Sequence, residues 1–261
     1  MAKSGTPPNP LVTTVSLCTP LLRGDKRPRV ALVGRFGVGK STIFNAASSP
    51  IARHERLAGL GGAYQECVLD VGLDQITLVD LPSIETLHHL SEHDQVVLMY
   101  LLWGDRWPLA AEQPALAQGS DFPAPDVLIQ VVVATTLEAD LELTLELSLF
   151  GRPLVIALNH IDEARKKGVF INVPALSERL GVPVVPTAAH MGKGISALFA
   201  KAIDVVREKA CPLPQPPTRH IAESLKPLKA VISRPDIEGV FQVPRALLLS
   251  QLAENDDYFL H

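Results

Sequence analysis

One stretch decides the fold: Gly34-Arg-Phe-Gly-Val-Gly-Lys-Ser41 satisfies the pattern GxxxxGK(S/T). It directly follows the apolar run Val30–Val33, which is typical of a buried strand, and it precedes Thr42–Ala47, whose apolar spacing favours a helix. A glycine-rich turn between a strand and a helix points successive backbone N–H groups at an anion. The sequence therefore predicts a phosphate-binding loop in the structural context that it requires.

The residues of this loop have separate roles in the predicted site. Lys40 supplies a cation for the β and γ phosphates of a nucleotide, and the Ser41 hydroxyl supplies a ligand for Mg²⁺. The backbone of the loop and of the first helical turn surrounds the phosphates. We therefore predict nucleotide contacts from Gly34, Gly37, Val38, Gly39, Lys40, Ser41 and Thr42.

A second magnesium ligand is expected at the end of a neighbouring strand. Asp80 ends the run Ile76-Thr-Leu-Val-Asp80, and Leu81-Pro82-Ser83 follows it. An Asp at the end of a strand is commonly a turn or helix cap, but the preceding phosphate loop favours a metal ligand here. The predicted magnesium ligands are therefore Ser41 and Asp80, and the predicted catalytic residues are Lys40, Ser41 and Asp80.

Another strand end predicts which base is bound. The run Leu154-Val-Ile-Ala-Leu-Asn-His-Ile-Asp162 is a buried strand that ends in Asn159, with Asp162 three residues later. A carboxylate there can accept from both N1–H and the N2 amine of guanine, whereas adenine has an acceptor at N1 and no amine at C2. Such acceptors reject the wrong base by on the order of 10⁴. An isolated NxxD is usually a turn cap, but after a phosphate loop and DxxS it predicts a guanine site.

The predicted base site has two parts. Asn159, His160 and Asp162 belong to the NxxD stretch. The next strand ends in Val185-Pro-Thr-Ala-Ala189, where the backbone amides of Thr187, Ala188 and Ala189 are expected beside the guanine oxygen.

Apolar runs that alternate with helical stretches predict the rest of the fold. We expect an α/β fold of the P-loop NTPase G-domain type, with a doubly wound, mostly parallel sheet. The expected parallel strands are Val30–Val33, Ile76–Leu81, Val127–Val133, Leu154–Leu158 and Val182–Pro186, and Tyr64–Val71 is expected as an antiparallel edge strand. The expected helices are Thr42–Ala47, Leu137–Leu149, Pro174–Leu180 and Ile195–Glu208.

Changes in composition divide the chain into four segments. Residues 1–28 form an N-terminal extension, residues 29–210 the G domain, residues 211–218 a Pro-rich linker and residues 219–261 a short helical appendage. Within the appendage we expect helices at His220–Ile232 and Arg245–Ala253. The segment Gly104–Pro125 is longer than compact domains usually need, which predicts a functional or mobile loop.

Composition excludes several classes of protein. The 261 residues include 24 Lys+Arg and 28 Asp+Glu, for a formal net charge of -4 without a block of like charges, which argues against a nucleic-acid partner. The first residues, MAKSGTPPNPL, lack the apolar core of a signal peptide. The longest apolar runs, such as Val96–Trp103, are too short to span a membrane, so a cytoplasmic location is expected.

These motifs resemble the cytoplasmic G domain of the ferrous iron transport protein B (FeoB) family. The resemblance covers Arg29–Arg207 and is carried by Ile76–Pro82, Leu141–Asn159, Ile161–Gly168, Leu180–Thr187 and Gly192–Ile195, with a further similar segment at Pro244–Leu252. It implies binding of GTP and GDP with Mg²⁺, and GTP hydrolysis coupled to Fe²⁺ uptake through an iron-transporting membrane domain, in cis or in trans. It also implies a place at the cytoplasmic face of the bacterial inner membrane and a homo-oligomer.

Three positions depart from the family pattern. Gly37 stands where the family has an Asn that helps to bind an activating potassium ion, Ser83 replaces the glycine of DxxG, and Tyr64 aligns with the Thr of the first switch. Ser83 keeps a backbone N–H but loses easy access to positive φ. We therefore expect slow hydrolysis without potassium activation, and GTP affinity no better than GDP affinity. A hydrolysis-impaired binding or assembly module is the alternative, and a P-loop kinase or ATPase also stays open.

A metal site elsewhere is a rival interpretation. His89-Leu-Ser-Glu-His93 fits H-x-x-E-H, the inverted zinc-peptidase pattern, and His88 is adjacent. The stretch directly follows Asp80–Ser83, where a G domain has a mobile switch, and no distant third ligand can be identified. A solvated helix face is therefore favoured over zinc or Fe²⁺ binding by His88, His89 and His93.

Overall fold

The computed structural model describes residues 27–48, 53–57, 63–88, 90–104, 124–212, 218–235, 237 and 243–253. Several predictions lie outside the described residues: those for positions 1–26 of the N-terminal extension, for positions 105–123 of the long loop, for positions 213–217 of the linker and for His89.

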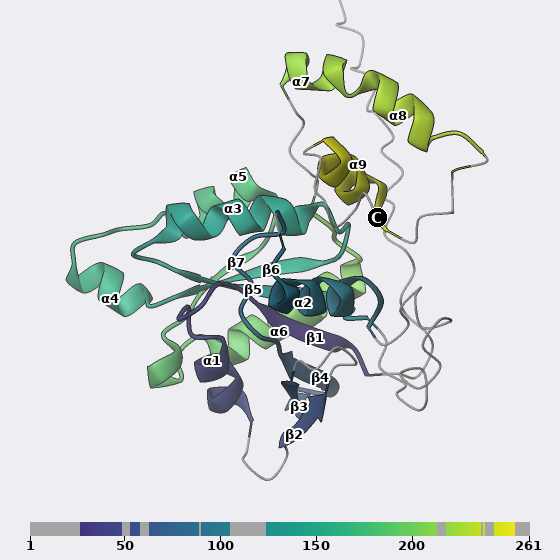
Figure 1. The fold of residues 1–261 in the computed structure, drawn as a ribbon. Coiled ribbons are helices and arrows are strands. Elements are labelled where there is room, and N and C mark those ends of the chain that lie inside the picture. Colours follow the sequence, from purple (N-terminus) through teal and green to yellow (C-terminus); the bar gives the residue numbers. More distant parts are fainter. Residues whose placement is uncertain are drawn as a thin grey trace, which may run out of the picture.

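A seven-stranded sheet forms the centre of the domain (Figure 1), in the order β2-β3-β4-β1-β5-β6-β7. Only β3 runs antiparallel to its neighbours β2 and β4, and the other described pairs are parallel. The predicted doubly wound, mostly parallel sheet is thereby confirmed. The strands are β1 (Arg29–Val33), β2 (Arg53–Leu57), β3 (Ala63–Val71), β4 (Asp74–Asp80), β5 (Val127–Val133), β6 (Leu154–Asn159) and β7 (Val184–Pro186).

The antiparallel strand does not lie at the edge of the sheet, where the sequence places it. Strand β2 pairs along its outer side, from Arg53 opposite Cys67 to Leu57 opposite Ala63. The β2 sequence RHERL has a single apolar residue, at its end. A charged edge strand protects a sheet from further pairing, but it contains no apolar run by which it could be predicted.

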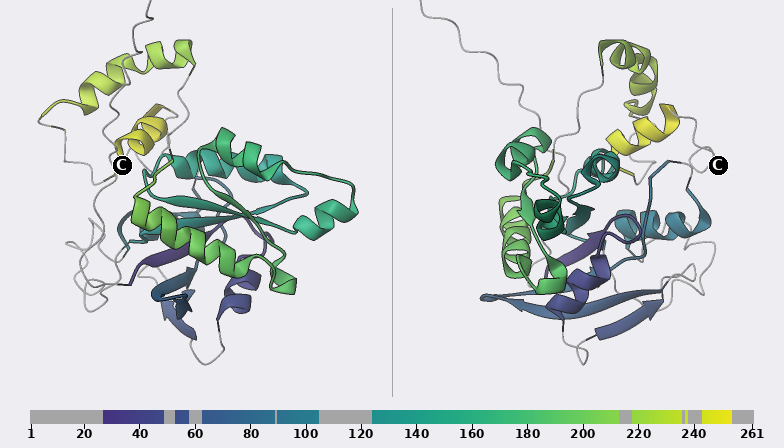
Figure 2. Two further views of the ribbon diagram at one scale, coloured as in Figure 1. Left: turned by 180° about the vertical axis from the view of Figure 1, so that it is seen from behind. Right: turned by 90° about the vertical axis from the view of Figure 1, so that its left-hand side faces the viewer.

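Helices cover both faces of the sheet (Figure 2). Helices α1 (Lys40–Ala47) and α6 (Ile195–Glu208) pack on one face, and α2 (Glu92–Trp103), α3 (Leu137–Ser148) and α5 (Val173–Leu180) pack on the other. Along β1, Val30 and Leu32 face the layer of α1 and α6. Ala31 and Val33 face the layer of α2, α3 and α5. Both faces of the central strands are buried, which is why these strands appear as continuous apolar runs.

Helix α2 is absent from the sequence prediction. Its residues from Val96 to Leu102 are all buried, so the helix lacks the polar face that reveals a 3.6-residue period. Its start is fixed by a capping box between Ser91 and Asp94. Since α2 begins only at Glu92, His88 precedes the helix, and the expected solvated helix face that includes His88 is wrong.

The C-terminal segment contains three described helices. In place of one helix at His220–Ile232, α7 (Arg219–Ser224) and α8 (Lys226–Ile232) meet at Leu225, because Pro227 lies in the first turn of α8. Helix α9 (Arg245–Ala253) buries Leu247 in the core shared with α2 and α3. None of the described helices is long and apolar enough to cross a bilayer.

Candidate nucleotide-binding site

The predicted site residues gather at the carboxyl ends of the parallel strands. Strand β1 lies between β4 and β5, and the loop from Gly34 to Gly39 leads from its end into α1 (Figure 1). Asp80 ends β4, and Asn159 ends β6. This edge of a doubly wound sheet is where such folds bind ligands.

Two glycines of the loop differ in what surrounds them. Both have positive φ, 77° at Gly37 and 98° at Gly39. A Cβ at Gly39 would lie 2.4 Å from Asn159 Nδ2, whereas nothing lies within 4 Å of a Cβ at Gly37. Gly39 is therefore needed for both its φ angle and its close approach to Asn159, and Gly37 only for its φ angle.

Lys40 lies inside the phosphate loop. Its Nζ donates to Gly34 O at 2.8 Å and to Arg35 O at 3.1 Å, and the residue is 8% exposed. Burial lowers the pKa of Lys40, while the charges of Asp80 and Glu85 oppose that shift. The ammonium thus lies within the loop, and two of its three donors are bonded to loop carbonyls. Ser41 and Thr42 are exposed at the start of α1.

The predicted magnesium ligands lie together. Burial raises the pKa of Asp80, and a hydrogen bond from Ser41 and the charge of Lys40 oppose that shift. Asp80 Oδ1 is buried without a hydrogen-bond partner among the residues that the structure describes. A carboxylate oxygen without a described partner beside a serine hydroxyl fits Mg²⁺, because this ion prefers oxygen ligands.

Asn159 joins the base end of the site to the phosphate loop. The residue is 1% exposed, and its Nδ2 donates to Val38 O at 3.0 Å. Its Oδ1 accepts from Ala189 N at 3.1 Å and from Thr187 Oγ1 at 3.3 Å. Asn159 therefore positions three parts of the predicted site relative to one another.

Asp162 has two acceptors that find no hydrogen-bond partner among the described residues. It lies in the first turn of α4 (Ile161–Lys166), which follows β6. Lys166 Nζ forms an ion pair with its Oδ2 at 3.7 Å, and His190 Nε2 lies 3.5 Å from the same oxygen. Within the described part of the chain neither carboxylate oxygen accepts a hydrogen bond, although both atoms are buried. The carboxylate therefore keeps the capacity to accept two further hydrogen bonds.

The amides predicted to face the guanine oxygen already have partners. Thr187 N donates to Leu158 O, Ala188 N to Lys193 O, and Ala189 N to Asn159 Oδ1. A contact from one of these amides to the base would have to replace an existing bond. The sequence could not indicate this, because the partners lie on β6 and on the return of the chain at Lys193.

His160 and His190 border Asp162. His160 has a φ of 58°, and its Nδ1 lies 3.0 Å from Glu163 Oε1. The rings of His160 and His190 stack with their centroids 6.3 Å apart and an interplanar angle of 18°. No motif indicates His190, which comes to the site only through the short helix η3 (Ala189–Met191).

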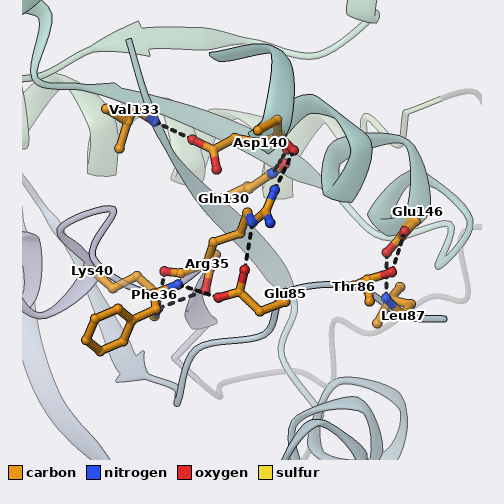
Figure 3. Close-up of polar contacts among 12 residues, drawn as sticks. Arg35, Phe36, Lys40, Glu85, Thr86, Leu87, Gln130, Val133, Asp140 and Glu146 are labelled. Atoms are coloured by element: carbon orange, nitrogen blue, oxygen red, sulfur yellow. Dashed lines mark hydrogen bonds and ion pairs between the residues drawn. The ribbon is translucent and has the colours of Figure 1, made fainter. Parts of the chain in front are cut away.

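An ion pair that no sequence motif indicates lies at the phosphate loop. Glu85 Oε2 accepts from Arg35 Nε at 2.8 Å, and Glu85 Oε1 accepts from Phe36 N at 2.9 Å (Figure 3). Arg35 Nη1 also donates to Ala139 O of α3 at 3.0 Å. Arg35 occupies a variable position of the loop pattern, and Glu85 lies outside every motif.

The segment after Asp80 is anchored to α3. Glu146 accepts from Thr86 Oγ1 at 2.9 Å and from Leu87 N at 2.6 Å (Figure 3), and it lies 3.1 Å from His88 Nε2. The described residues contain no cluster of three His, Cys, Asp or Glu side chains that could hold a metal. The structure thus places His88 beside Glu146 instead of in a described metal cluster.

The structure shows the surroundings of Tyr64 and Ser83, two of the positions that depart from the family pattern. Tyr64 is buried on β3, with its ring 5.0 Å from that of Tyr100. Ser83 is not among the described residues with positive φ, so it causes no backbone strain in this conformation. The stretch before Tyr64 that contains positions 49–52 and 58–62 lies partly outside the described residues.

Comparison with known proteins assigns the family. Residues 118–202 match the family described as ferrous iron transport protein B. The Fe(2+) transporter FeoB of Salmonella typhimurium is 37% identical over 177 residues, which cover 66% of this chain and 20% of that protein. The chain carries a G domain of the FeoB family. A Porphyromonas gingivalis protein is described as a fusion of Fe(2+) transport protein A and the Fe(2+) transporter FeoB. It is 35% identical over 177 residues, which cover 68% of this chain and 19% of that protein.

Solved FeoB structures share the fold. The cytosolic domain of T. maritima FeoB in its GMPPNP form has a TM-score of 0.74 at 23% identity, covering 89% of this chain and 83% of that one. A mutant of S. thermophilus NFeoB bound to GDP has a TM-score of 0.73 at 26% identity. The match covers 90% of this chain and 81% of that one. The match to the curated FeoB proteins, in contrast, spans about a fifth of their length, 19% and 20%.

Proposed function

We propose that this FeoB-type domain binds GTP and GDP with Mg²⁺ and hydrolyses GTP slowly. The observation that carries the proposal is the carboxylate of Asp162, whose two buried oxygens accept no hydrogen bond within the described residues. A purine that offers two adjacent donors would satisfy both oxygens. Asn159 connects this carboxylate's end of the site to the loop that contains Lys40, so one nucleotide can reach both.

The proposed catalytic role of the domain is electrostatic. Lys40 would hold the β and γ phosphates, and Ser41 and Asp80 would hold Mg²⁺, whose charge would stabilise negative charge on the phosphates. Gly37 has no side chain for an additional cation, and the Tyr64 ring is buried against Tyr100. Slow turnover without potassium activation follows from these two features.

The cellular role is proposed from the relatives. They are named as Fe(2+) transporters, so we place this domain at the cytoplasmic face of the bacterial inner membrane. There it regulates ferrous iron uptake through an iron-transporting membrane domain, in cis or in trans. In this proposal residues 29–210 are the nucleotide-binding unit, since β1 to α6 form the sheet and both helical layers.

A homo-oligomer is part of the proposal. Exchange of a terminal element between copies is a low-cost route to a dimer. Light scattering should give a mass above that of the monomer, and a monomer that persists at high concentration would contradict the proposal.

A second function is favoured by the same departures from the family. If Gly37 and the buried Tyr64 abolish hydrolysis, the domain serves as a nucleotide-dependent binding or assembly module. Such a module would still use Asp162 and Lys40 to bind GTP and GDP.

Two measurements test these functions in sequence. Calorimetric titration with GDP and ADP, each with Mg²⁺, should show binding of GDP and much weaker binding of ADP. Equal affinities would contradict the guanine site and favour a P-loop kinase or ATPase. Single-turnover hydrolysis then separates the two remaining functions: slow conversion of GTP supports the GTPase, and bound GTP that stays intact supports the module.

A further inference from the structure

A carboxylate of this chain lies at the phosphate loop. Glu85 accepts a hydrogen bond from the backbone N–H of Phe36, which belongs to the loop, and another from the guanidinium of Arg35 (Figure 3). These are the kinds of donor that a P-loop presents to phosphate oxygens. Glu85 thus occupies donors that an anionic ligand could use.

The charges around Glu85 match those expected around a terminal phosphate. The hydrogen bonds from Phe36 N and Arg35, together with the charge of Lys40, hold the pKa of Glu85 below its usual range. Glu85 in turn opposes the lowering of the Lys40 pKa, so the two charges interact across the loop. The carboxylate is therefore ionised at neutral pH and lies in the field of the cation assigned to the β and γ phosphates.

Contacts on both sides hold Glu85 at this position. On one side, Ile84 N donates to Gly34 O at 3.2 Å, which ties the segment to the phosphate loop. On the other side, Thr86 and Leu87 bond to Glu146 of α3. Glu85 lies five residues beyond Asp80, in the segment that γ-phosphate and Mg²⁺ order in G domains.

We propose that Glu85 sets the preference between nucleoside diphosphate and triphosphate, because its carboxylate competes with the γ-phosphate for the Phe36 N–H and the cations beside it. This inference rests on the proposed function. A diphosphate has no γ-phosphate to compete for the Phe36 N–H, so it binds while Glu85 keeps its hydrogen bonds. A triphosphate has to displace Glu85 and overcome the repulsion between two anions.

The expected size of the effect is moderate. The side chains of Arg35 and Glu85 are 31% and 49% exposed, so water screens their charges. Removing the charge of Glu85 should strengthen triphosphate binding roughly three- to tenfold. Diphosphate affinity should change by less than about twofold.

Glu85→Gln tests the proposal, because it removes the charge and keeps the size and an oxygen that can accept from Phe36 N. Dissociation constants for GDP and for the non-hydrolysable analogue GMPPNP are measured with Mg²⁺ in the unmutated protein and in the variant. Glu142→Gln on α3 is the matched control, since Glu142 is exposed and acts on Arg35 only through its charge. We expect a higher ratio of GMPPNP to GDP affinity in Glu85→Gln and an unchanged ratio in the control.

The possible outcomes separate this inference from the function on which it rests. GDP binding with an unchanged GMPPNP-to-GDP ratio in Glu85→Gln overturns the inference alone. An equal loss of both affinities shows that Glu85 only supports the loop, and it also overturns the inference. If the unmutated protein binds no GDP, the proposed function and this inference both fail.

Discussion

The base end and the phosphate end of the site differ in how their polar groups are occupied. At the base end, both oxygens of Asp162 lack a hydrogen-bond partner within the described structure. At the phosphate end, Lys40 bonds to the carbonyls of Gly34 and Arg35, and the Phe36 N–H bonds to Glu85. A ligand gains most where it satisfies a buried group without a partner, and less where it exchanges one bond for another. Asp162 should therefore control specificity, and the loop should adjust affinity.

The largest effect is expected at Asp162. Asp162→Ala removes both acceptors for guanine, so the preference for GDP over ADP should fall by about 10³-fold. Competition binding with a fluorescent nucleotide measures the preference, and Glu163→Gln, one residue further along α4, is the control. A preference that survives in Asp162→Ala would show that the base end does not read guanine.

Lys40→Ala should have the next largest effect. Loss of the ammonium should weaken GMPPNP binding by about 10²-fold and GDP binding by less, because the cation faces both the β and γ oxygens. The exposed Lys167→Ala serves as the control in the same titrations. Normal triphosphate affinity in Lys40→Ala would rule out the loop as the phosphate site.

A pair of glycine variants tests the connection between the two ends. Alanine at either position has to adopt a positive φ, which costs about 1–2 kcal/mol. Gly39→Ala also places a Cβ 2.4 Å from Asn159 Nδ2, whereas Gly37→Ala meets no atom within 4 Å. Gly39→Ala should therefore lower the free energy of unfolding by about 2 kcal/mol more than Gly37→Ala, as measured in urea. Equal losses of unfolding free energy in the two variants would mean that the added Cβ at position 39 does not clash with Asn159.

The smallest effect is expected from potassium. Single-turnover GTP hydrolysis should be equally slow in matched sodium and potassium buffers, because Gly37 offers no side chain to the ion. Gly37→Asn alone should not restore activation, since Tyr64 on β3 is buried against Tyr100. A large potassium stimulation of the unmutated protein would show that the alignment of the loop and first switch is wrong.

The parts of the fold that follow a local pattern could be predicted. Strands β1, β5 and β6 are buried on both faces and appear as apolar runs, and the phosphate loop has a fixed spacing. Strand β2 could not be predicted, because its sequence RHERL contains no apolar run. Helix α2 could not be predicted, because burial on nearly all sides removes its helical periodicity.

Within the site, the unpredicted residues depend on tertiary contacts. Glu85 reaches Phe36 N across 49 residues, and His190 reaches Asp162 through η3. Neither position has a spacing that would mark it. The motifs indicate the side chains that would face the ligand, whereas the partners that hold or occupy those side chains appear only once the chain is folded.

Gln251 of α9 has a consequence for how the chain folds during synthesis. Its Nε2 donates to Leu87 O at 3.0 Å, across 164 residues. All seven strands of the sheet precede α9, so a nascent chain can complete the sheet and the phosphate loop before Gln251 leaves the ribosome. The segment beside Glu85 can thus receive this restraint only after the whole sheet has been synthesised.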